Sequence, residues 1–525
     1  MIFPKIIDSI EDNMEVQDST ENDLNGKKMK WHANRKKKLI IDEVITAENY
    51  YTQGKFSAAL KRANILDNKA VDLPGNLVIL PYGMKLIKLF SKHIETAFEQ
   101  YGLQEHSYPL TAPIDSFEAE KKIFNLKDKI LYIANDSELE SGSPRGVLCP
   151  TGEATIYTHW GKEITTSSDL PITLYQKTNY FRPFSSGKHT GKGIFRALEA
   201  GDIFEFHSCF ATKEQALFNL RKYYNMLCEI SNKLHVPTLW TLRPPWTNNE
   251  NLYEWSMGGD VPLPTGNTVQ TATLYNQGDV FSKAYNITFK NITFKTDNKS
   301  HYTQQVTGCV TRRLILAHLM LGMDVEGNLF VHPDLSPTQV SIIFKKNNNV
   351  HNSSISNFIH SVAVKYRVSS VISNDKKVII KHKNQNLCQG VPLEIFIQDK
   401  RDSTDKYKIV FTRCDTFEKS EVYVDSLDGI IHIIPSIMQM IGITFKQKVD
   451  KFYKNQLLQV TTIEQLSSAK NKLKLFPLLF DKKCCLDIEK MCNGEILGFL
   501  ETEDTGKCIL TGKKTKYTAV LSRRI

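Results

Sequence analysis

Apolar side chains recur at helical spacing in two separate stretches of the chain. Between Tyr82 and Gly102 they return every three or four residues, which predicts an amphipathic helix. The sequence TRRLILAHLMLGM, from Thr311, is apolar on nearly every helical face, which is typical of a fully buried helix. The sequence HSYPLTAPI, after the first helix, predicts a strand that enters a turn.

Two β-rich runs enclose a glycine-rich stretch between Thr173 and Phe210. The runs TLYQKTNYF and DIFEFHSCF predict the two strands of an antiparallel hairpin. Arg182 and Arg196 flank the loop, which also carries three glycines, two lysines and a histidine. Because a guanidinium binds two phosphate oxygens at once, the hairpin indicates a polyphosphate site. For a single arginine, a surface salt bridge is the alternative interpretation.

The pattern changes near residue 340, which indicates a domain boundary. The run FVHPDLSPTQVSIIF predicts a strand that leaves the first domain, and the polar run KKNNNVHNSSISN after it predicts a linker. A new β/α pattern follows. We therefore expect a polar tail over residues 1–45, a large domain over 46–335, a second domain over 336–447 and a C-terminal domain over 448–525.

Composition indicates a multi-domain protein of the cytoplasm. A chain of 525 residues is too long for one ordinary domain. The most apolar run, GIIHIIPSIMQMIGIT, is interrupted by His432 and Pro435, so we expect no membrane-spanning helix. The N-terminus has acids where a secretory signal is basic and then apolar. The ten scattered cysteines are typical of reduced, buried thiols.

The net charge of +10 is unevenly distributed. Residues 1–25 hold seven acids and one lysine, whereas the run GKKMKWHANRKKKL holds seven Lys or Arg and no acid. The first 45 residues therefore predict an acidic, disordered tail followed by a basic arm. The arm has two interpretations, a solvated tail or a segment that contacts phosphates of a nucleic acid.

Nine segments stand in order along the chain: PYGMKLIKLF, HSYPL with Pro109, CPTGEATIY, DLPITLYQKTNYFR, EFHSCFAT, VQTATLYNQGDVFSKAYNI, QQVTGCVTRRLILAHLMLGMDVEGNLFVHPDLSPTQV, GVPLEIFIQDKRD and GKCILTGKKTKYTAV. Together they resemble class II aminoacyl-tRNA synthetases, most closely the prolyl-tRNA synthetases of the archaeal and eukaryotic-cytoplasmic type, with Pro109 as the proline of the first class II motif. The resemblance implies an α/β (α+β) fold. Its parts are an antiparallel-sheet catalytic core over 46–335, a mixed α/β anticodon-binding-like domain over 336–447 and a small C-terminal α/β domain over 448–525.

The same resemblance implies an enzyme that activates proline or a close analogue with ATP and Mg²⁺, and transfers it to tRNA. It also implies a homodimer that forms through the first motif. Arg182 matches the motif 2 arginine on the α-phosphate and carboxylate, Arg196 the hairpin arginine toward the γ end, and Arg312 the motif 3 arginine. Gln270 and Thr273 match the residues that hold adenosine and substrate.

Amino-acid recognition in the family implies roles for four further residues. Thr151 and Glu153 match the positions that take the amino group, His207 a histidine beside the proline ring, and Tyr275 a pocket histidine. Without the resemblance, Glu153 is interpreted as a helix N-terminal charge and His207 as a structural histidine. Glu199 is the best magnesium or ATP-side carboxylate, with a surface salt bridge as the alternative.

The chain departs from the family around ATP and the amino-acid ring. Phe184 stands in place of the motif 2 glutamate, Ile203 and Thr307 in place of tryptophans, and Tyr275 in place of a histidine, and the loop is longer. Losing an aromatic wall is worth about 1 to 3 kcal/mol of discrimination, so we expect a changed pocket. Two alternatives follow: a paralog with a different amino acid or acceptor, and a catalytically silent homologue that binds RNA or a partner.

The C-terminal domain also departs from the family, whose members often bind zinc there. Cys484 and Cys485 are adjacent, Cys508 lies in GKCILTG, and Thr511 stands where a paired cysteine is expected. A structural zinc site needs four ligands, so we expect no zinc, with Cys485 and Cys508 as the remnant of a degenerate site. Glu394 replaces a customary arginine in the second domain, which weakens the expectation of anticodon reading.

Overall fold

The computed structural model describes most of the chain outside its first 51 residues. The described residues are 31–32, 52–70, 75–117, 130–182, 194–195, 197–247, 253–292, 299–345, 352–400, 406–468 and 471–525. The predictions for Phe184, Arg196, the glycine-rich loop and nearly all of the N-terminal tail fall outside these ranges.

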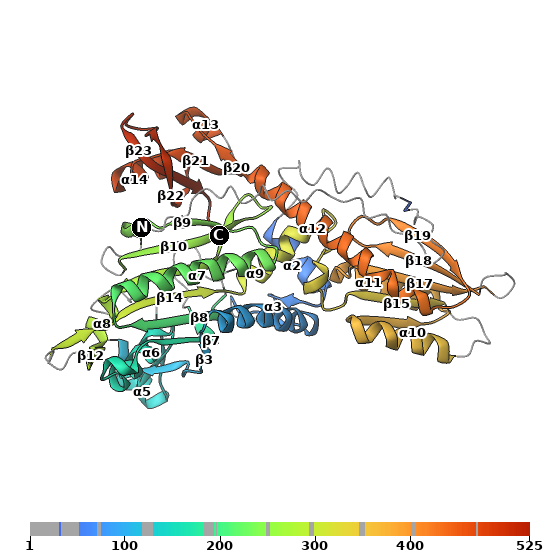
Figure 1. Ribbon diagram of the computed structural model, residues 1–525, viewed down its shortest axis with the longest axis horizontal. Helices are drawn as coiled ribbons and strands as arrows, with labels where there is room; N and C mark the ends of the chain where they lie inside the picture. The colour runs from blue at the N-terminus through green and yellow to red at the C-terminus, as the bar shows by residue number, and fades with distance from the viewer. Residues whose placement is uncertain are drawn as a thin grey trace.

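A large sheet of eleven strands forms the left-hand part of the molecule in Figure 1. Its strand order is β20-β21-β23-β22-β9-β10-β11-β14-β8-β7-β3. Neighbouring strands are antiparallel, apart from the parallel pairs β3/β7 and β20/β21. The strands are β3 (Gln104–Glu105), β7 (Ile172–Phe181), β8 (Glu199–Phe210), β9 (Leu239–Leu242), β10 (Trp255–Pro262), β11 (Thr268–Gly278), β14 (Gln304–Val310), β20 (Leu457–Gln459), β21 (Leu473–Pro477), β22 (Glu495–Lys507) and β23 (Lys514–Ser522).

The predicted hairpin between Thr173 and Phe210 is confirmed. Strands β7 and β8 pair antiparallel from Ile172↔Cys209 to Phe181↔Glu199, with an irregularity between Thr178 and Tyr180. Leu174, Tyr175 and Gln176 are buried in succession in β7, so both faces of the strand are covered there.

Long helices cover one face of this sheet. They are α3 (Pro81–Gln100), α7 (Lys213–Lys233) and α9 (Arg313–Gly322). The two predicted helices are therefore confirmed as α3 and α9, and every residue of α9 from Leu314 to Gly322 is buried. Thr212 caps α7 in a capping box with Gln215, which fixes where this helix begins.

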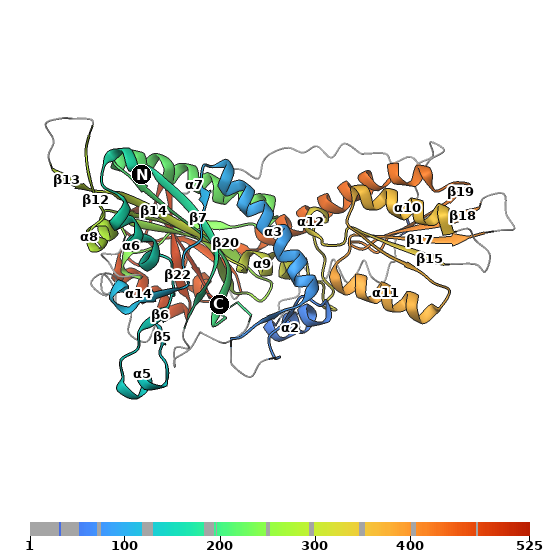
Figure 2. The same ribbon diagram turned by 90° about the horizontal axis from the view of Figure 1, so that it is seen from below.

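Shorter elements lie on the opposite side of the sheet, as the view in Figure 2 shows for α5 and its neighbouring strands. These elements are α5 (Asp136–Ser141), α6 (Glu153–Glu163), α8 (Val280–Tyr285), β4 (Thr111–Pro113), β5 (Leu131–Ile133) and β6 (Gly146–Leu148). Two small two-stranded sheets pair β1 (Leu66–Asp67) with β2 (Val78–Ile79) and β12 (Thr288–Lys290) with β13 (Ser300–Tyr302). Helix α2 (Gln53–Arg62) precedes β1.

A second sheet of five strands forms a separate domain with order β16-β15-β17-β18-β19. Helices α10 and α12 lie on one side of this sheet and α11 on the other (Figure 2). The elements are β15 (Val340–Lys345), α10 (Asn352–Lys365), β16 (Val368–Ile372), α11 (Lys376–Gln389), β17 (Leu393–Asp399), β18 (Tyr407–Arg413), β19 (Lys419–Val424) and α12 (Ile434–Gln456). The expected boundary between residues 447 and 448 lies inside α12.

One helical run among the described residues, Asp428–Gln456, is long and apolar enough by length and composition to cross a membrane. Its side chains Ile437, Ile441 and Phe445 are buried in the main hydrophobic core of the chain. The apolar composition of this run is therefore used in packing within the protein.

The C-terminal strands extend the large sheet of the first domain. Strand β22 pairs with β9 at Phe499↔Leu242, and Ile525 donates its backbone N–H to the carbonyl of Thr268. Helices α13 (Ile463–Ser468) and α14 (Lys482–Cys492) accompany these strands. At the other end of the chain, Trp31 and His32 lie on the second domain, where His32 and Lys419 exchange backbone hydrogen bonds.

Candidate active site

Side-chain alternation places two neighbouring rows of residues, most of them polar, on the sheet face opposite α7 and α9. Residues directly opposite each other in antiparallel strands point to the same face. One such row is Glu205 (β8), Cys309 (β14), Thr273 (β11) and Gly258 (β10), and the next is His207, Thr307, Tyr275 and Ser256. The intervening residues Phe206, Leu274 and Val306 belong to the hydrophobic core on the other face. The candidate site residues of three strands are thus brought to one surface.

Two carboxylates are buried together on this face. Glu153 is the first residue of α6 and Glu205 lies in the middle of β8, and their exposed fractions are 6% and 7%. The Thr151 hydroxyl lies against both side chains, at hydrogen-bond distance from Glu153 and 3.3 Å from Oε1 of Glu205. Gln277 Nε2 donates to Glu153 Oε1 at 3.5 Å.

Glu205 is held from the neighbouring strand and from the turn before α6. The Tyr180 hydroxyl donates to Glu205 Oε2, and Gln176 Nε2 donates to the Tyr180 oxygen at 2.8 Å. A Cβ atom on Gly152 would lie 2.5 Å from both Glu205 Oε2 and the Tyr180 oxygen. The glycine in PTGE is therefore required for the close approach of the turn to the carboxylate.

His207 is fully buried and lies between Glu205 and α6. Its Nε2 atom is 3.3 Å from Glu205 Oε2, and its Nδ1 atom is 3.0 Å from the Tyr157 hydroxyl. The rings of Tyr157 and Trp160 approach the imidazole edge to face, at centroid distances of 5.3 and 6.5 Å. The histidine is thus fixed in orientation, with one side toward a carboxylate and the other in aromatic surroundings.

The three ionisable groups of this cluster have shifted pKa values. Burial, and then the negative charge of Glu205, raises the pKa of Glu153. Burial alone would raise the pKa of Glu205 and lower that of His207. The attraction between the two groups outweighs burial, so the pKa of Glu205 is lowered and the pKa of His207 is raised. The cluster therefore favours the ionised forms of Glu205 and His207 and the protonated form of Glu153.

Arg182 directly follows β7, and its backbone N–H donates to the carbonyl of Leu198 at 2.8 Å. Its positive charge acts on Cys309, whose pKa is nonetheless raised to about 11 because the thiol is buried. The Cys309 sulfur lies 3.2 Å from the Thr273 hydroxyl oxygen. The positive charge of Arg182 therefore acts on the row that contains Cys309 and Thr273. Arg196, its predicted partner, lies outside the described residues.

Arg312 precedes α9 and is paired with a carboxylate that sequence reasoning missed. Its Nε atom lies 2.7 Å from Asp202 Oδ2, and both side chains are mostly buried. Lys177 Nζ approaches the other oxygen of Asp202 at 3.6 Å. Glu199, the predicted magnesium or ATP-side carboxylate, is exposed and accepts a hydrogen bond of 2.6 Å from Asn179 Nδ2. The carbonyl oxygen of Gln270 accepts from Arg313 Nη1 at 3.4 Å.

The positions that depart from the family line the same face. The ring of Tyr275 stacks on Tyr253 at a centroid distance of 4.4 Å and an interplanar angle of 30°. The Thr307 hydroxyl donates to the carbonyl of Phe206 at 2.8 Å, so its polar atom is turned into the strand. Ile203 is buried with Tyr180 and Cys149 in a small apolar cluster.

The sequence also did not predict a buried ion pair, which lies at the β9/β10 end of the face. Arg243 Nη1 lies 2.7 Å from Asp260 Oδ2, with side-chain exposures of 6% and 0%. A Cβ atom on Gly258 would lie 1.8 Å from Arg243 Nη2, so the guanidinium packs directly on the strand that pairs with Thr273. Arg243 Nη1 also contacts the carbonyl oxygen of Leu497 in β22. The pair thus joins the C-terminal strands to the candidate site.

Comparison with known proteins agrees with this architecture. Residues 139–320 match the tRNA synthetase class II core domain (G, H, P, S and T). The chain contains a class II tRNA synthetase core. The proline--tRNA ligase of Thermococcus kodakarensis is 27% identical over 484 residues, which cover 89% of this chain and 96% of that relative. The proline--tRNA ligase of Methanocaldococcus jannaschii is 27% identical over 470 residues, which cover 88% of this chain and 98% of that relative.

Solved structures show the same fold around this class II core. Giardia lamblia prolyl-tRNA synthetase in complex with prolyl-adenylate has a TM-score of 0.79 and 20% identity, with 90% of this chain and 98% of that chain covered. Cryptosporidium parvum prolyl-tRNA synthetase complexed with L-proline and AMP has a TM-score of 0.76 and 19% identity, with coverages of 90% and 94%. The predicted class II fold is therefore confirmed.

Three of the four cysteines of the C-terminal part are buried in an apolar cluster with Ile488 and Phe499: Cys484, Cys485 and Cys508. Cys492 packs against this cluster. Burial raises the pKa of Cys485 to about 12, which disfavours the thiolate that binds a metal. Across the described ranges, no three His, Cys, Asp or Glu side chains are grouped closely enough to hold a metal ion. The degenerate zinc site stays a prediction.

Proposed function

We propose that this chain activates proline with ATP and transfers it to tRNA. The observation that carries the proposal is the buried cluster of Thr151, Glu153, Glu205 and His207 on a class II core. Two relatives that match nearly the whole chain are proline--tRNA ligases, and one structural neighbour holds prolyl-adenylate. Glu153 offers a buried carboxyl group that can ionise beside a cationic amine, which suits an amino-acid substrate.

The proposed reaction has two steps. A carboxylate oxygen of proline attacks the α-phosphorus of ATP, the bond between the α- and β-phosphates breaks, and pyrophosphate leaves. A ribose hydroxyl at the end of tRNA then attacks the carbonyl carbon of prolyl-adenylate, and AMP leaves. Charge accumulates on the α-phosphate in the first step, so a fixed cation there lowers the barrier. Arg182 takes this role, while Arg312 and Arg196 hold the remaining phosphates.

Recognition of the amine follows from the charges of the cluster. The ammonium group of proline stabilises the ionised form of Glu153, whose pKa is raised in the free protein by burial and by Glu205. Thr151 supplies a hydroxyl beside this carboxylate. The imidazole of His207 carries no negative charge and so cannot pair with the ammonium group, and it forms one wall beside the ring.

Adenosine and the metal are assigned to residues at the rim of the face. Gln270 and Thr273 hold adenosine and the substrate. Mg²⁺ would neutralise the phosphates, and we assign to it the exposed carboxylate of Glu199 at the start of β8. One protein carboxylate is enough because substrate phosphates and water supply most ligands of Mg²⁺. The chain would act in the cytoplasm as a homodimer.

A second candidate is a class II synthetase with a changed amino-acid specificity. Tyr275 stacks on Tyr253, and Thr307 stands in place of a tryptophan beside it. The Arg243 guanidinium also lies on this face next to Gly258. These features alter the shape and the charge of the pocket wall, and each such change shifts discrimination by about 1 to 3 kcal/mol.

Amino-acid-dependent exchange of pyrophosphate into ATP separates these functions. The purified full chain is assayed with each of the twenty amino acids and with proline analogues. Exchange that depends on proline supports the proposal, and exchange with a different amino acid alone supports the second candidate. Absence of exchange with every amino acid contradicts both, and leaves a homologue that binds RNA or a partner without catalysis.

A further inference from the structure

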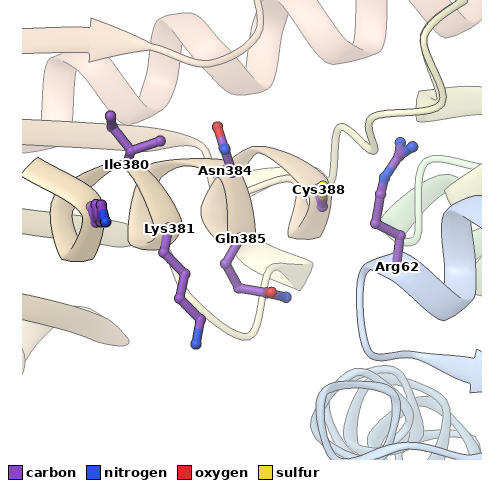
Figure 3. Close-up of a pocket in the computed structure, with 7 residues that line it drawn as sticks. Arg62, Ile380, Lys381, Asn384, Gln385 and Cys388 are labelled. Carbon is purple, nitrogen blue, oxygen red and sulfur yellow. The ribbon is translucent and has the colours of Figure 1, made fainter.

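Gln305 in β14 carries a buried side-chain amide to which no described residue bonds. Its exposed fraction is 0%, and neither its Nε2 nor its Oε1 atom has a hydrogen-bond partner across the described ranges of the chain. Exposed amides need no protein partner because water bonds to them, as for Asn384 and Gln385, which line the groove between α2 and α11 in Figure 3. A buried amide that stays unbonded costs free energy, so a ligand that reaches Gln305 gains two hydrogen bonds.

The strand register places Gln305 on the face of the sheet that carries the candidate active site. Gln305 and Thr307 are two residues apart in β14, so their side chains point to the same face. The residue opposite Gln305 in β8 is Cys209, which lies two residues after His207. Cys209 belongs to an apolar cluster with Tyr157 of α6, which covers this face. The amide of Gln305 therefore lies one row beyond His207 and Thr307.

Two other buried glutamines on this face, Gln176 and Gln277, have partners at both ends of their amides. Each donates from Nε2 and accepts at Oε1, and the partners are Tyr180 and the backbone N–H of Tyr108 for Gln176, and Glu153 and Tyr157 for Gln277. Thr307 does not supply a partner for Gln305, since its hydroxyl donates to the carbonyl of Phe206. Gln305 differs from the other two glutamines in having both amide atoms available for a ligand.

The apolar surroundings of Gln305 favour a neutral ligand group. Aromatic rings follow one another over this part of the face, with centroid distances of 5.6 Å from Tyr157 to Phe281, 6.3 Å from Phe281 to Tyr253 and 4.4 Å from Tyr253 to Tyr275. An unpaired charge is costly to bury in such surroundings. A hydroxyl is a small neutral group that both donates and accepts, so it matches both atoms of the amide with little added volume.

We propose that Gln305 is a specificity-determining residue that binds a hydroxyl group on the substrate ring, so that the site takes a ring-hydroxylated proline in preference to proline. This inference rests on the proposed function, in which the proline ring lies beside His207. Nε2 of Gln305 donates to the hydroxyl oxygen, and Oε1 accepts the hydroxyl proton. A substrate without the hydroxyl leaves the buried amide unbonded, and a site built in this way discriminates against that substrate.

The test is calorimetric titration of the full chain with proline and with the hydroxyprolines, which carry the hydroxyl at different ring positions and on either ring face. The best hydroxyproline is expected to bind about tenfold or more tightly than proline. Gln305→Leu replaces the amide with an apolar group of similar size and is expected to remove this preference. Gln304→Leu is the matched control and is expected to keep the preference, because Gln304 lies opposite Phe210 on the other face of β14.

The outcomes separate this inference from the proposed function. If pyrophosphate exchange depends on no amino acid and on no hydroxyproline, the proposed function fails, and the binding preference with its loss in Gln305→Leu still decides the role of Gln305. Equal binding of proline and every hydroxyproline overturns the inference, because a buried water then satisfies the amide. Failure of every compound to bind, or a preference that persists in Gln305→Leu, also overturns it.

The melting temperature of the ligand-free variant provides a second readout. Gln305→Leu removes a buried amide that has no partner, so the melting temperature of this variant is expected to rise above that of the wild-type chain. A marked fall would show that the amide is already bonded in the free protein, which overturns the inference.

Discussion

His207 Nε2 lies 3.3 Å from Glu205 Oε2 in the interior of the class II core. Both side chains are buried, and the nearest further carboxylate, Glu153, is joined to Glu205 through Thr151. Two carboxyl groups and one imidazole therefore share a space that excludes water. Their protonation states depend on one another, and a ligand that carries a positive charge changes all three.

Replacing Glu205 with Gln leaves a buried histidine without its counter-charge. Removing one partner of a buried ion pair costs about 3 to 5 kcal/mol, so we expect a loss of this size in the free energy of unfolding. The pKa of His207, which Glu205 raises against the effect of burial, is expected to fall. Denaturant unfolding and NMR titration of the imidazole measure the two effects. The exposed variant Glu199→Gln is the control, and equal losses in both variants would contradict the assignment.

The affinity for proline is expected to depend on the pH through Glu153. The pKa of this carboxyl group is raised by burial and by Glu205, and an ammonium ligand requires the ionised form. Below that pKa, binding releases one proton, so the dissociation constant is expected to fall about tenfold for each pH unit of increase. Calorimetric titration with proline in buffers of different pH measures this slope. Glu153→Gln is expected to bind weakly with no such slope, and a preserved slope would assign the proton to another group.

Arg182 is expected to act on the adenylation step. Loss of one group that stabilises developing charge lowers kcat by about 10²- to 10³-fold, so Arg182→Ala should lose exchange activity on this scale. Arg182→Lys keeps the charge without the planar fork and should recover only part of the activity. Arg221, which is exposed on α7, offers the matched control Arg221→Ala. If both alanine variants keep full exchange, Arg182 has no role at the phosphate.

The sequence predicted the elements whose pattern is local. The β7/β8 hairpin and the buried helix α9 were recognisable from β-rich and apolar runs within the segments themselves. The extension of the first sheet by β22 at Phe499↔Leu242 was not predicted, because these residues are more than 250 positions apart. The boundary expected at 447 falls within α12, since a helix that continues between domains leaves no polar linker in the sequence.

Only part of the candidate site could be predicted from the sequence, because its residues come from several separate elements. Thr151, Glu153 and His207 were found through their resemblance to family motifs, and the structure brings them together. Glu205 was missed because a single acid in an alternating strand is ordinarily an exposed residue. The partners Arg243 and Asp260 became visible only through the register of β9 and β10, which no local pattern reveals. The contacts of Thr151 with Glu205 and of Arg243 with Asp260 join separate elements, and hydrophobic periodicity does not report polar contacts of this kind.

The ion pair between Arg243 and Asp260 is expected to stabilise the junction with the C-terminal strands. Asp260→Asn leaves a buried guanidinium without its counter-charge, so we expect a loss of about 3 to 5 kcal/mol in the free energy of unfolding. Glu421→Gln, which breaks the partly exposed pair with Lys408, is expected to cost less than about 1 kcal/mol. Equal costs for the two variants in denaturant unfolding would show that the buried pair does not hold the junction.

The formation of prolyl-adenylate on the protein tests the central claim most directly. The full chain is mixed with ATP and labelled proline, passed rapidly through a gel-filtration column, and analysed for adenylate that elutes with the protein. We predict close to one prolyl-adenylate per chain, and a large reduction in both Glu153→Gln and Arg182→Ala. Adenylate of another amino acid, or no adenylate from any of the twenty, would contradict proline activation at this site.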